Sequence, residues 1–404
     1  MRKIVLNTLI IVAVGDAGEL LYLEADNGLN GAKGTQVMRY DGTNVPELAD
    51  PNASVSDVRD IIGYQGKLYF RATHPEYGTE LFVYDGKQTA LAADIYEGGG
   101  SFPQAMAVFN GKLYFNANHP DYGKELFVYD GESASLAADI DPGHKTYAPY
   151  PPNDGSPTDL TVYNAHLYFK AGNDLGGGLW KYNGSDAPER VEINSTVVYY
   201  PDDLTVFDGK LYFAANGGSG DRLWQYDGSS SVAVPMAVTG LCTRPGNLTV
   251  YNSKLYFNGY DERNSENSRG GFLCSYDGTS IHLEVDGSAF PGEGLEDLTA
   301  FGNKLYFLDE DYSLWSYDGA SADNAMDIFP AGVEVYALVG VFMNKLFFTA
   351  YDDAHGEELW EYDGINPSSV IDINPGVGDS SAWADTMFDF GGHVHPSLLM
   401  YLLN

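Results

Sequence analysis

The sequence predicts an all-β fold built from repeated four-stranded sheets, and three observations support this prediction. A segment that opens with Leu-Tyr-Phe and closes with Tyr-Asp-Gly, or near copies of both, occurs eight times along the 404 residues. The repeat is close in length to one propeller blade. No stretch of ten or more residues has apolar positions three and four apart, as helical repeats would. We therefore predict a closed β-propeller.

The second residue of each Leu-Tyr-Phe segment marks the repeat. The interval between these markers runs from 41 residues, between Tyr306 and Phe347, to 54 residues, between Tyr114 and Tyr168. The repeat continues from end to end without a Pro-rich or low-complexity break, so we predict that residues 1–404 form a single domain. The markers are Tyr22, Tyr69, Tyr114, Tyr168, Tyr212, Tyr256, Tyr306 and Phe347.

One repeat, DLTVYNAHLYFKAGNDLGGGLWKYNGSDAPERVEI, illustrates the predicted blade. It divides into four strands at 160–163, 166–171, 178–182 and 190–193. Asn-Gly and Asp-Gly pairs tolerate positive φ and predict tight turns after the first and third strands. Apolar residues are nearly continuous within the strands, so both faces of each sheet must be covered. Neighbouring blades would cover them.

The sequence allows two interpretations of the number of blades. Three segments after the eighth repeat resemble strands, at 386–390, 393–395 and 398–402, and residues 3–7 would supply a fourth. We predict nine four-stranded antiparallel blades, the last stitched from both termini, because an open fan would leave sheet edges unpaired. Eight blades plus a C-terminal tail is the alternative, which the short connection between residues 7 and 10 favours.

Residues 1–17 have two interpretations. Two basic residues followed by an apolar stretch are typical of a short secretory signal. The stretch leads directly into the first repeat, however, so we favour a strand. It is too short to cross a bilayer, and we predict no membrane span. Cys242 and Cys274 both fall in the sixth repeat, and their spacing leaves a disulfide between them undecided.

The net charge of −35, from 57 acidic and 22 basic residues, argues against a nucleic-acid partner because such a field repels phosphate. We predict no cofactor. A structural calcium ion is the alternative, with Asp309 and Asp311 as candidate ligands, although their spacing does not match a dedicated calcium loop.

The third strands GTELFVYDG, GKELFVYDG and GEELWEYDG, with the following LAADIYEGG, LAADIDPG and VIDINPG, resemble the ELWxxDGT repeats of hyalin-type bacterial surface and secreted proteins. Most copies lack the usual Thr after Tyr-Asp-Gly, with Thr43 and Thr279 as exceptions. The resemblance implies a β-propeller at the cell exterior or surface. It implies no single activity.

Loops joining second to third strands share one face of a propeller, and binding residues commonly lie on such loops. On that face we predict a ligand-binding surface formed by three loops. Its residues are His74, Tyr77, His119, Asp121, Tyr122, Asp352, Asp353 and His355. No nucleophile elbow, zinc motif or phosphate loop appears. We therefore predict a non-catalytic protein that binds a glycan or a cell-surface protein. The alternatives are a self-assembling surface layer or filament subunit, and a polysaccharide lyase or hydrolase with an axial site.

Overall fold

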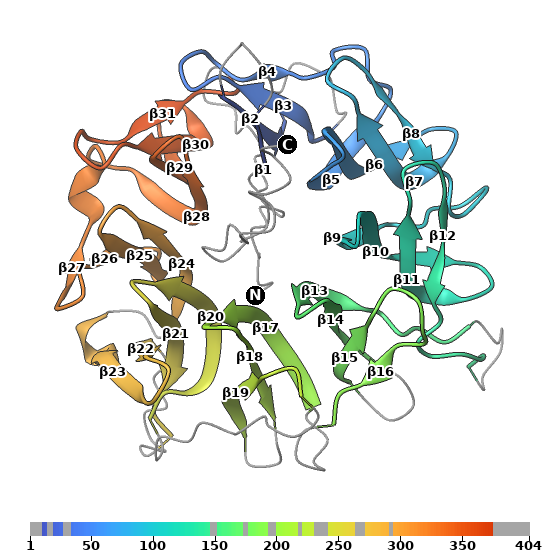
Figure 1. Cartoon of the computed structure of the whole chain (residues 1–404). Helices are drawn as coiled ribbons and strands as arrows, with labels where there is room; N and C mark the ends of the chain where they lie inside the picture. Colours follow the sequence, from blue (N-terminus) through green and yellow to red (C-terminus); the bar gives the residue numbers. More distant parts are fainter. Residues whose placement is uncertain are drawn as a thin grey trace.

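The computed structural model describes residues 10–13, 19–26, 34–145, 152–172, 177–192, 199–216, 220–229, 241–262, 271–290 and 294–374. Eight antiparallel sheets stand around a central axis, with the first strand of each blade innermost and the last at the rim (Figure 1). The described residues contain no α-helix, only the short 3-10 helices η2 (Gly287–Ala289) and η3 (Met326–Ile328).

The first four blades follow one another along the chain. Their strands are β1 (Ile10–Ala13), β2 (Glu19–Ala25), β3 (Gln36–Tyr40) and β4 (Glu47–Leu48); β5 (Ser56–Tyr64), β6 (Lys67–His74), β7 (Gly78–Tyr84) and β8 (Thr89–Ala93); β9 (Gln104–Phe109), β10 (Lys112–His119), β11 (Gly123–Tyr129) and β12 (Ala134–Ala138); β13 (Thr158–Tyr163), β14 (His166–Ala171), β15 (Gly178–Tyr182) and β16 (Glu189–Arg190).

The other four blades complete the ring, and within the described residues the fifth has three strands. Their strands are β17 (Tyr199–Phe207), β18 (Lys210–Asn216) and β19 (Asp221–Tyr226); β20 (Thr243–Tyr251), β21 (Lys254–Tyr260), β22 (Phe272–Tyr276) and β23 (Ile281–Val285); β24 (Leu295–Phe301), β25 (Lys304–Asp309), β26 (Leu314–Tyr317) and β27 (Ala322–Asn324); β28 (Glu334–Phe342), β29 (Lys345–Asp352), β30 (Gly356–Tyr362) and β31 (Ser369–Ile371).

A repeated aromatic pair joins every blade to the next and explains why both sequence motifs recur. The aromatic residue in the middle of Leu-Tyr-Phe contacts the Tyr of Tyr-Asp-Gly in the following blade, with ring centroids 5.4 to 6.4 Å apart. Such tilted and edge-on pairs add stability beyond the area they bury. The pairs are Tyr22–Tyr84, Tyr69–Tyr129, Tyr114–Tyr182, Tyr168–Tyr226, Tyr212–Tyr276, Tyr256–Tyr317, Tyr306–Tyr362 and Phe347–Tyr40.

The pair between Phe347 and Tyr40 closes the ring between the eighth and first blades, so the prediction of nine blades is wrong. Tyr40 also donates a hydrogen bond to Glu361 at 3.1 Å, and both blades contribute to one buried cluster. Each blade covers the other's apolar face directly, and no ninth sheet is needed between them. The eight-blade alternative is confirmed. The segments predicted as ninth-blade strands, 3–7, 386–390, 393–395 and 398–402, lie outside the described residues.

A buried glutamate in three third strands explains another part of the repeat. Glu80, Glu125 and Glu358 are fully buried. The Glu125 carboxylate accepts hydrogen bonds from the backbone N–H groups of Ile140, Gly155 and Asp141 at 2.7, 2.6 and 3.4 Å. Burial nevertheless raises the pKa of Glu125 to about 7. This glutamate fixes the connection to the next blade, so it is a structural residue.

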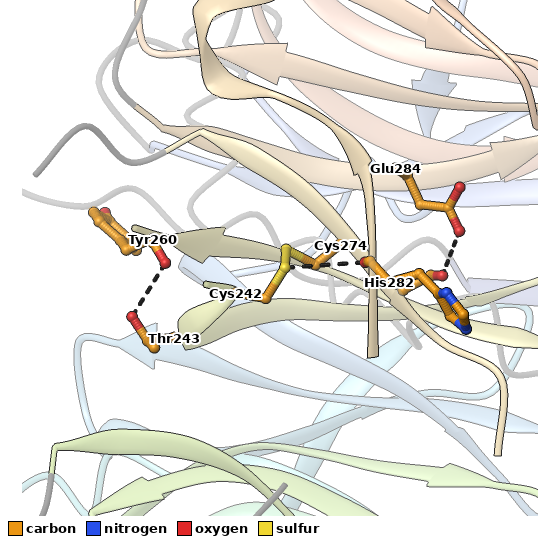
Figure 2. The surroundings of a disulfide bond; sticks show 7 residues. Cys242, Thr243, Tyr260, Cys274, His282 and Glu284 are labelled. Carbon is orange, nitrogen blue, oxygen red and sulfur yellow. Dashed lines mark hydrogen bonds between the residues drawn. A yellow bond between two sulfur atoms is a disulfide. The ribbon is translucent and has the colours of Figure 1, made fainter. Parts of the chain in front are cut away.

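The sixth blade has a disulfide between Cys242 and Cys274 in place of the aromatic residue of the third strand (Figure 2). In six other blades that position is an aromatic residue, such as Trp224, whose indole N–H donates to the Ala215 carbonyl at 2.9 Å, and in the first blade it is Met38. Gly259 takes the place of Ala215 in the sixth blade. A Cβ there would lie 2.8 Å from both Cys242 Cα and Cys274 Sγ. The glycine leaves the space that the disulfide fills.

Candidate functional site

The ring has two different faces. The loop-rich face carries the turns between second and third strands and the connections between blades, while the tight-turn face carries the remaining turns. The two kinds of loop on the loop-rich face touch, since a side chain at Gly78 would collide with the Gly99 carbonyl oxygen. On the tight-turn face, the Asp of Tyr-Asp-Gly closes its own turn. Asp85, for example, accepts hydrogen bonds from the N–H groups of Lys87 and Gln88 at 2.9 Å.

The predicted binding loops of the second and third blades are built alike. The His74 ring stacks on Tyr77 with centroids 4.8 Å apart, and His119 stacks on Tyr122 at 4.9 Å. The Nδ1 atom of each histidine accepts a backbone N–H from two residues further on, Glu76 at 3.1 Å and Asp121 at 3.2 Å. Both tyrosines are therefore held in a defined orientation by their own loops.

The predicted loop of the eighth blade uses different residues at the same positions. Asp352 replaces the histidine, and His355 replaces the tyrosine. The Asp352 carboxylate accepts the N–H groups of Ala354 and His355 at 2.9 and 2.7 Å and contacts His355 Nδ1 at 2.9 Å. Asp353 is exposed. The first blade separates this loop from those of the second and third blades, so the predicted residues form two groups on one face.

Of the two predicted calcium ligands, Asp309 has a structural role. Asp309 is buried, and its carboxylate accepts hydrogen bonds from Asp311 N, Ser313 N and Trp315 Nε1 at 2.9 to 3.0 Å. The Asp309 carboxylate thus holds its own loop and the Trp315 indole. In the fifth blade the backbone carbonyl of Ala215 holds the equivalent indole, that of Trp224. Within the described ranges, no three His, Cys, Asp or Glu residues are grouped so that they could bind a metal ion.

Exposed aromatic side chains distinguish the two faces. In the described part of the chain, the exposed aromatic side chains are Phe102 (46%), Tyr122 (38%), Tyr200 (67%) and Tyr312 (55%). All four lie on the loop-rich face, in inter-blade connections, second-to-third-strand turns or the start of an inner strand. The large apolar residues exposed elsewhere are aliphatic: Val45, Leu283, Val341 and Ile365.

Sequence reasoning missed Phe102 and Tyr200. Both precede the first residue of the second strand by ten positions and have left-handed backbone, with φ of +51° and +54°. Asp57, Ser156 and Arg244 have the same conformation at the equivalent position. Residue type gave no signal, because residues other than Gly, Asn and Asp rarely have a positive φ. The only signal in the sequence was the fixed spacing of ten residues before the second strand.

Between the second and third blades, aromatic rings flank a segment without side chains. Gly98, Gly99 and Gly100 separate Tyr96 from Phe102. A Cβ at Gly99 would lie 2.8 Å from the Tyr96 ring, and one at Gly100 would lie 2.9 Å from the Phe102 ring. Together with the neighbouring Tyr77, these residues form an aromatic surface beside one of the predicted loops.

Acidic residues on the inner strands form a second feature that was not predicted as a site. The Asp203 carboxylate accepts the backbone N–H of Asn247 in the next blade at 2.7 Å, and Asp297 accepts that of Leu338 at 3.1 Å. Asp159 occupies the same position in the fourth blade. Burial and the nearby Asp202 carboxylate raise its pKa to about 7. The signal was a recurring Asp-Leu-Thr, and it mainly marks contacts between blades.

No helix in the described ranges is both long and apolar enough to span a membrane. No protein-family model matches the chain, and no curated protein does. Among solved structures, the computationally designed Ika8 protein is similar, with 14% identity, a TM-score of 0.50, and coverage of 88% of this chain and 98% of that one.

A structure from a study of two prolyl endopeptidases is also similar, with 13% identity and a TM-score of 0.52. The match covers 78% of this chain but only 50% of the endopeptidase chain. BamB from Moraxella catarrhalis matches at 15% identity and a TM-score of 0.47, over 85% and 91% of the two chains. At these identities the likeness extends to the fold alone. The chain is a β-propeller of eight blades.

Proposed function

We propose that this protein is a non-catalytic, extracellular binding propeller whose loop-rich face holds a glycan. The observation that carries the proposal is the position of the exposed aromatic side chains Phe102, Tyr122, Tyr200 and Tyr312, all on that face. Aromatic rings offer large, rigid apolar surfaces with polar edges, which suit the apolar face of a pyranose. Exposed apolar patches rimmed by polar groups are typical of binding surfaces.

Two observations support an extracellular location. The third-strand repeats resemble those of hyalin-type surface and secreted proteins. The disulfide between Cys242 and Cys274 is the kind of bond that persists in oxidising compartments and is rare in the cytosol. Both cysteines are buried in one blade. The bond therefore belongs to the folded unit itself.

Binding to a panel of neutral and acidic polysaccharides tests the proposal. Simultaneous change of Phe102, Tyr122 and Tyr200 to Ala should abolish binding by removing the exposed rings. The matched control changes Val45 and Ile365 to Ala on the tight-turn face, where they are 60% and 87% exposed. Binding that survives the first change, or is lost with the control, would contradict the proposed face. Absence of binding to every glycan would contradict the ligand class.

Self-assembly into a surface layer is a second candidate, favoured by the exposure of Ile365 and Val45 in turns of the neighbouring eighth and first blades. Apolar residues so exposed are candidates for contacts between copies. Light scattering over a wide concentration range tests it. A particle of constant monomer mass would reject assembly, whereas growth that the Val45 and Ile365 changes abolish would support it.

A glycan-cleaving enzyme is a third candidate, favoured by two carboxyl groups near the axis. Lys170 Nζ contacts Asp202 at 3.3 Å, and burial together with the nearby Asp202 carboxylate raises the pKa of Asp159 to about 7, so Asp159 could give up and take up a proton near neutral pH. A carboxyl group with a raised pKa can serve as the general acid in glycoside hydrolysis. New reducing ends formed by the native chain but not by D159N would favour cleavage over binding alone.

A further inference from the structure

Arg244 lies on the loop-rich face at the start of β20 and is the exposed cation of a small charged cluster. Its side chain is 58% exposed. It occupies the position in the sixth blade that Tyr200 occupies in the fifth, so the two side chains belong to neighbouring inner strands. Its guanidinium carbon lies 5.9 Å from the centroid of the Tyr260 ring, within the range of a cation–π contact.

The carboxylate nearest to Arg244 is already occupied by another arginine. Arg222 contacts both carboxylate oxygens of Glu262, at 3.0 and 3.3 Å. Arg244 Nε lies 3.8 Å from the same carboxylate, beyond hydrogen-bond distance. We find no further hydrogen-bond or ion-pair partner for Arg244 among the described residues. Two guanidinium groups thus share one carboxylate, which leaves hydrogen-bond donors of Arg244 available.

The two acidic side chains of the preceding inner strand, Asp202 and Asp203, have other partners. Asp203 accepts the backbone N–H of Asn247, and Asp202 contacts Lys170. Both groups are therefore engaged with other partners.

The backbone that carries Arg244 is fixed on its N-terminal side. Cys242, two residues earlier, is bound covalently to Cys274, and Thr243 donates a hydrogen bond to the Tyr260 carbonyl at 3.2 Å (Figure 2). Tyr260 in turn lies beneath the guanidinium group. A side chain held on a rigid support loses less entropy when it binds a ligand.

We propose that Arg244, with Tyr260 beneath it and Tyr200 on the neighbouring strand, binds the carboxylate of a uronic-acid unit in an acidic glycan. The planar guanidinium group matches a carboxylate with two parallel N–H donors, and the aromatic rings suit the sugar that carries the acid. This inference rests on the proposed function and names its ligand class. The net negative charge of the protein repels an acidic glycan mainly through charges far from Arg244, and 0.15 M salt screens charges that lie more than about 8 Å away.

The test compares three uronate polysaccharides, polygalacturonate, alginate and hyaluronan, each with its carboxyl-reduced counterpart, at 0.15 M salt. At least one acidic form should bind the native protein about tenfold more tightly than its reduced form, as expected for a charge-assisted hydrogen bond. R244Q should remove this preference and leave binding of the reduced form unchanged. R39Q is the matched control, because Arg39 is an exposed arginine paired with Glu47 on the first blade.

A preference that R244Q abolishes and R39Q preserves supports the inference. Equal affinity for acidic and reduced forms, a preference retained by R244Q, or equal losses in both variants would overturn it. If the reduced glycans bind and lose affinity with the Phe102, Tyr122 and Tyr200 changes, the proposed function stands and only the acidic subsite falls. If neither form of any glycan binds, both proposals fall. Thermal unfolding of each variant confirms that it is folded.

Discussion

Reduction of the Cys242–Cys274 disulfide should loosen the sixth blade and leave distant blades unchanged. The two cysteines are 32 residues apart, for which loss of chain entropy in the unfolded state gives about 4 kcal/mol of stabilisation. The large side chain that packs at this position in the other blades, aromatic in six of them and Met38 in the first, is missing here, so no side chain replaces the bond. Amides of β22 should therefore exchange up to about 900-fold faster after reduction.

Hydrogen exchange followed by mass spectrometry compares peptides from β22 with peptides from β7 in the oxidised and reduced protein. A second perturbation is Gly259→Ala, since the added Cβ would lie 2.8 Å from Cys274 Sγ and Cys242 Cα. It should loosen the same blade without any reductant. Gly172→Ala is the control, because its Cβ meets nothing within 4 Å. Unchanged exchange in β22 after reduction, or equal acceleration in β7, would refute the reasoning.

Three further predictions concern buried groups. The pKa of Asp159 is about 7 in the folded state against 3.8 normally, so the folded state keeps a proton that the unfolded chain releases, and stability falls as pH rises between these two values. The stability of D159N relative to the native protein, measured by urea unfolding, should therefore increase by about 2 to 4 kcal/mol between pH 4 and pH 8. A difference that stays constant with pH would contradict the shift. Glu125→Ala leaves three backbone N–H groups without their acceptor and should destabilise the protein by about 3 to 6 kcal/mol. Glu125→Gln should destabilise it less, because Gln36 occupies this position in the first blade. Equal losses of thermal stability in the two variants would argue against this role of Glu125. Phe347→Ala at the closure of the ring should cost about 3 to 5 kcal/mol in unfolding free energy, and a loss below 1 kcal/mol would indicate that the contact between the first and eighth blades is unimportant.

Most of the fold could be predicted because each repeat specifies its own sheet. The predicted strands 166–171 and 178–182 coincide with β14 and β15, and the Asp-Gly pairs mark observed turns. The blade count could not be read in the same way. Closure depends on which apolar faces meet across the ring, and the contact between Tyr40 and Phe347 joins residues more than 300 positions apart. Only the three-dimensional arrangement brings them together.

The candidate site was predictable only in part. His74 with Tyr77 and His119 with Tyr122 were visible as twin loops, and the structure explains each pair by its stacking. Phe102 could not be distinguished by sequence from the many buried aromatic residues, because nothing in its residue type marks its left-handed backbone in the connection before β9. The Asp309 carboxylate accepts hydrogen bonds from its own loop and from the partly buried indole of Trp315, a role that the spacing of the acidic residues did not indicate.

Hydroxyl-radical footprinting of the protein with and without a bound glycan tests the central claim most directly, because it reports side-chain exposure on both faces at once. Our account predicts protection of Phe102, Tyr122 and Tyr200 on the loop-rich face, with Val45 and Ile365 on the tight-turn face unchanged. Protection of Val45 and Ile365 with no change at the three aromatic residues would contradict it.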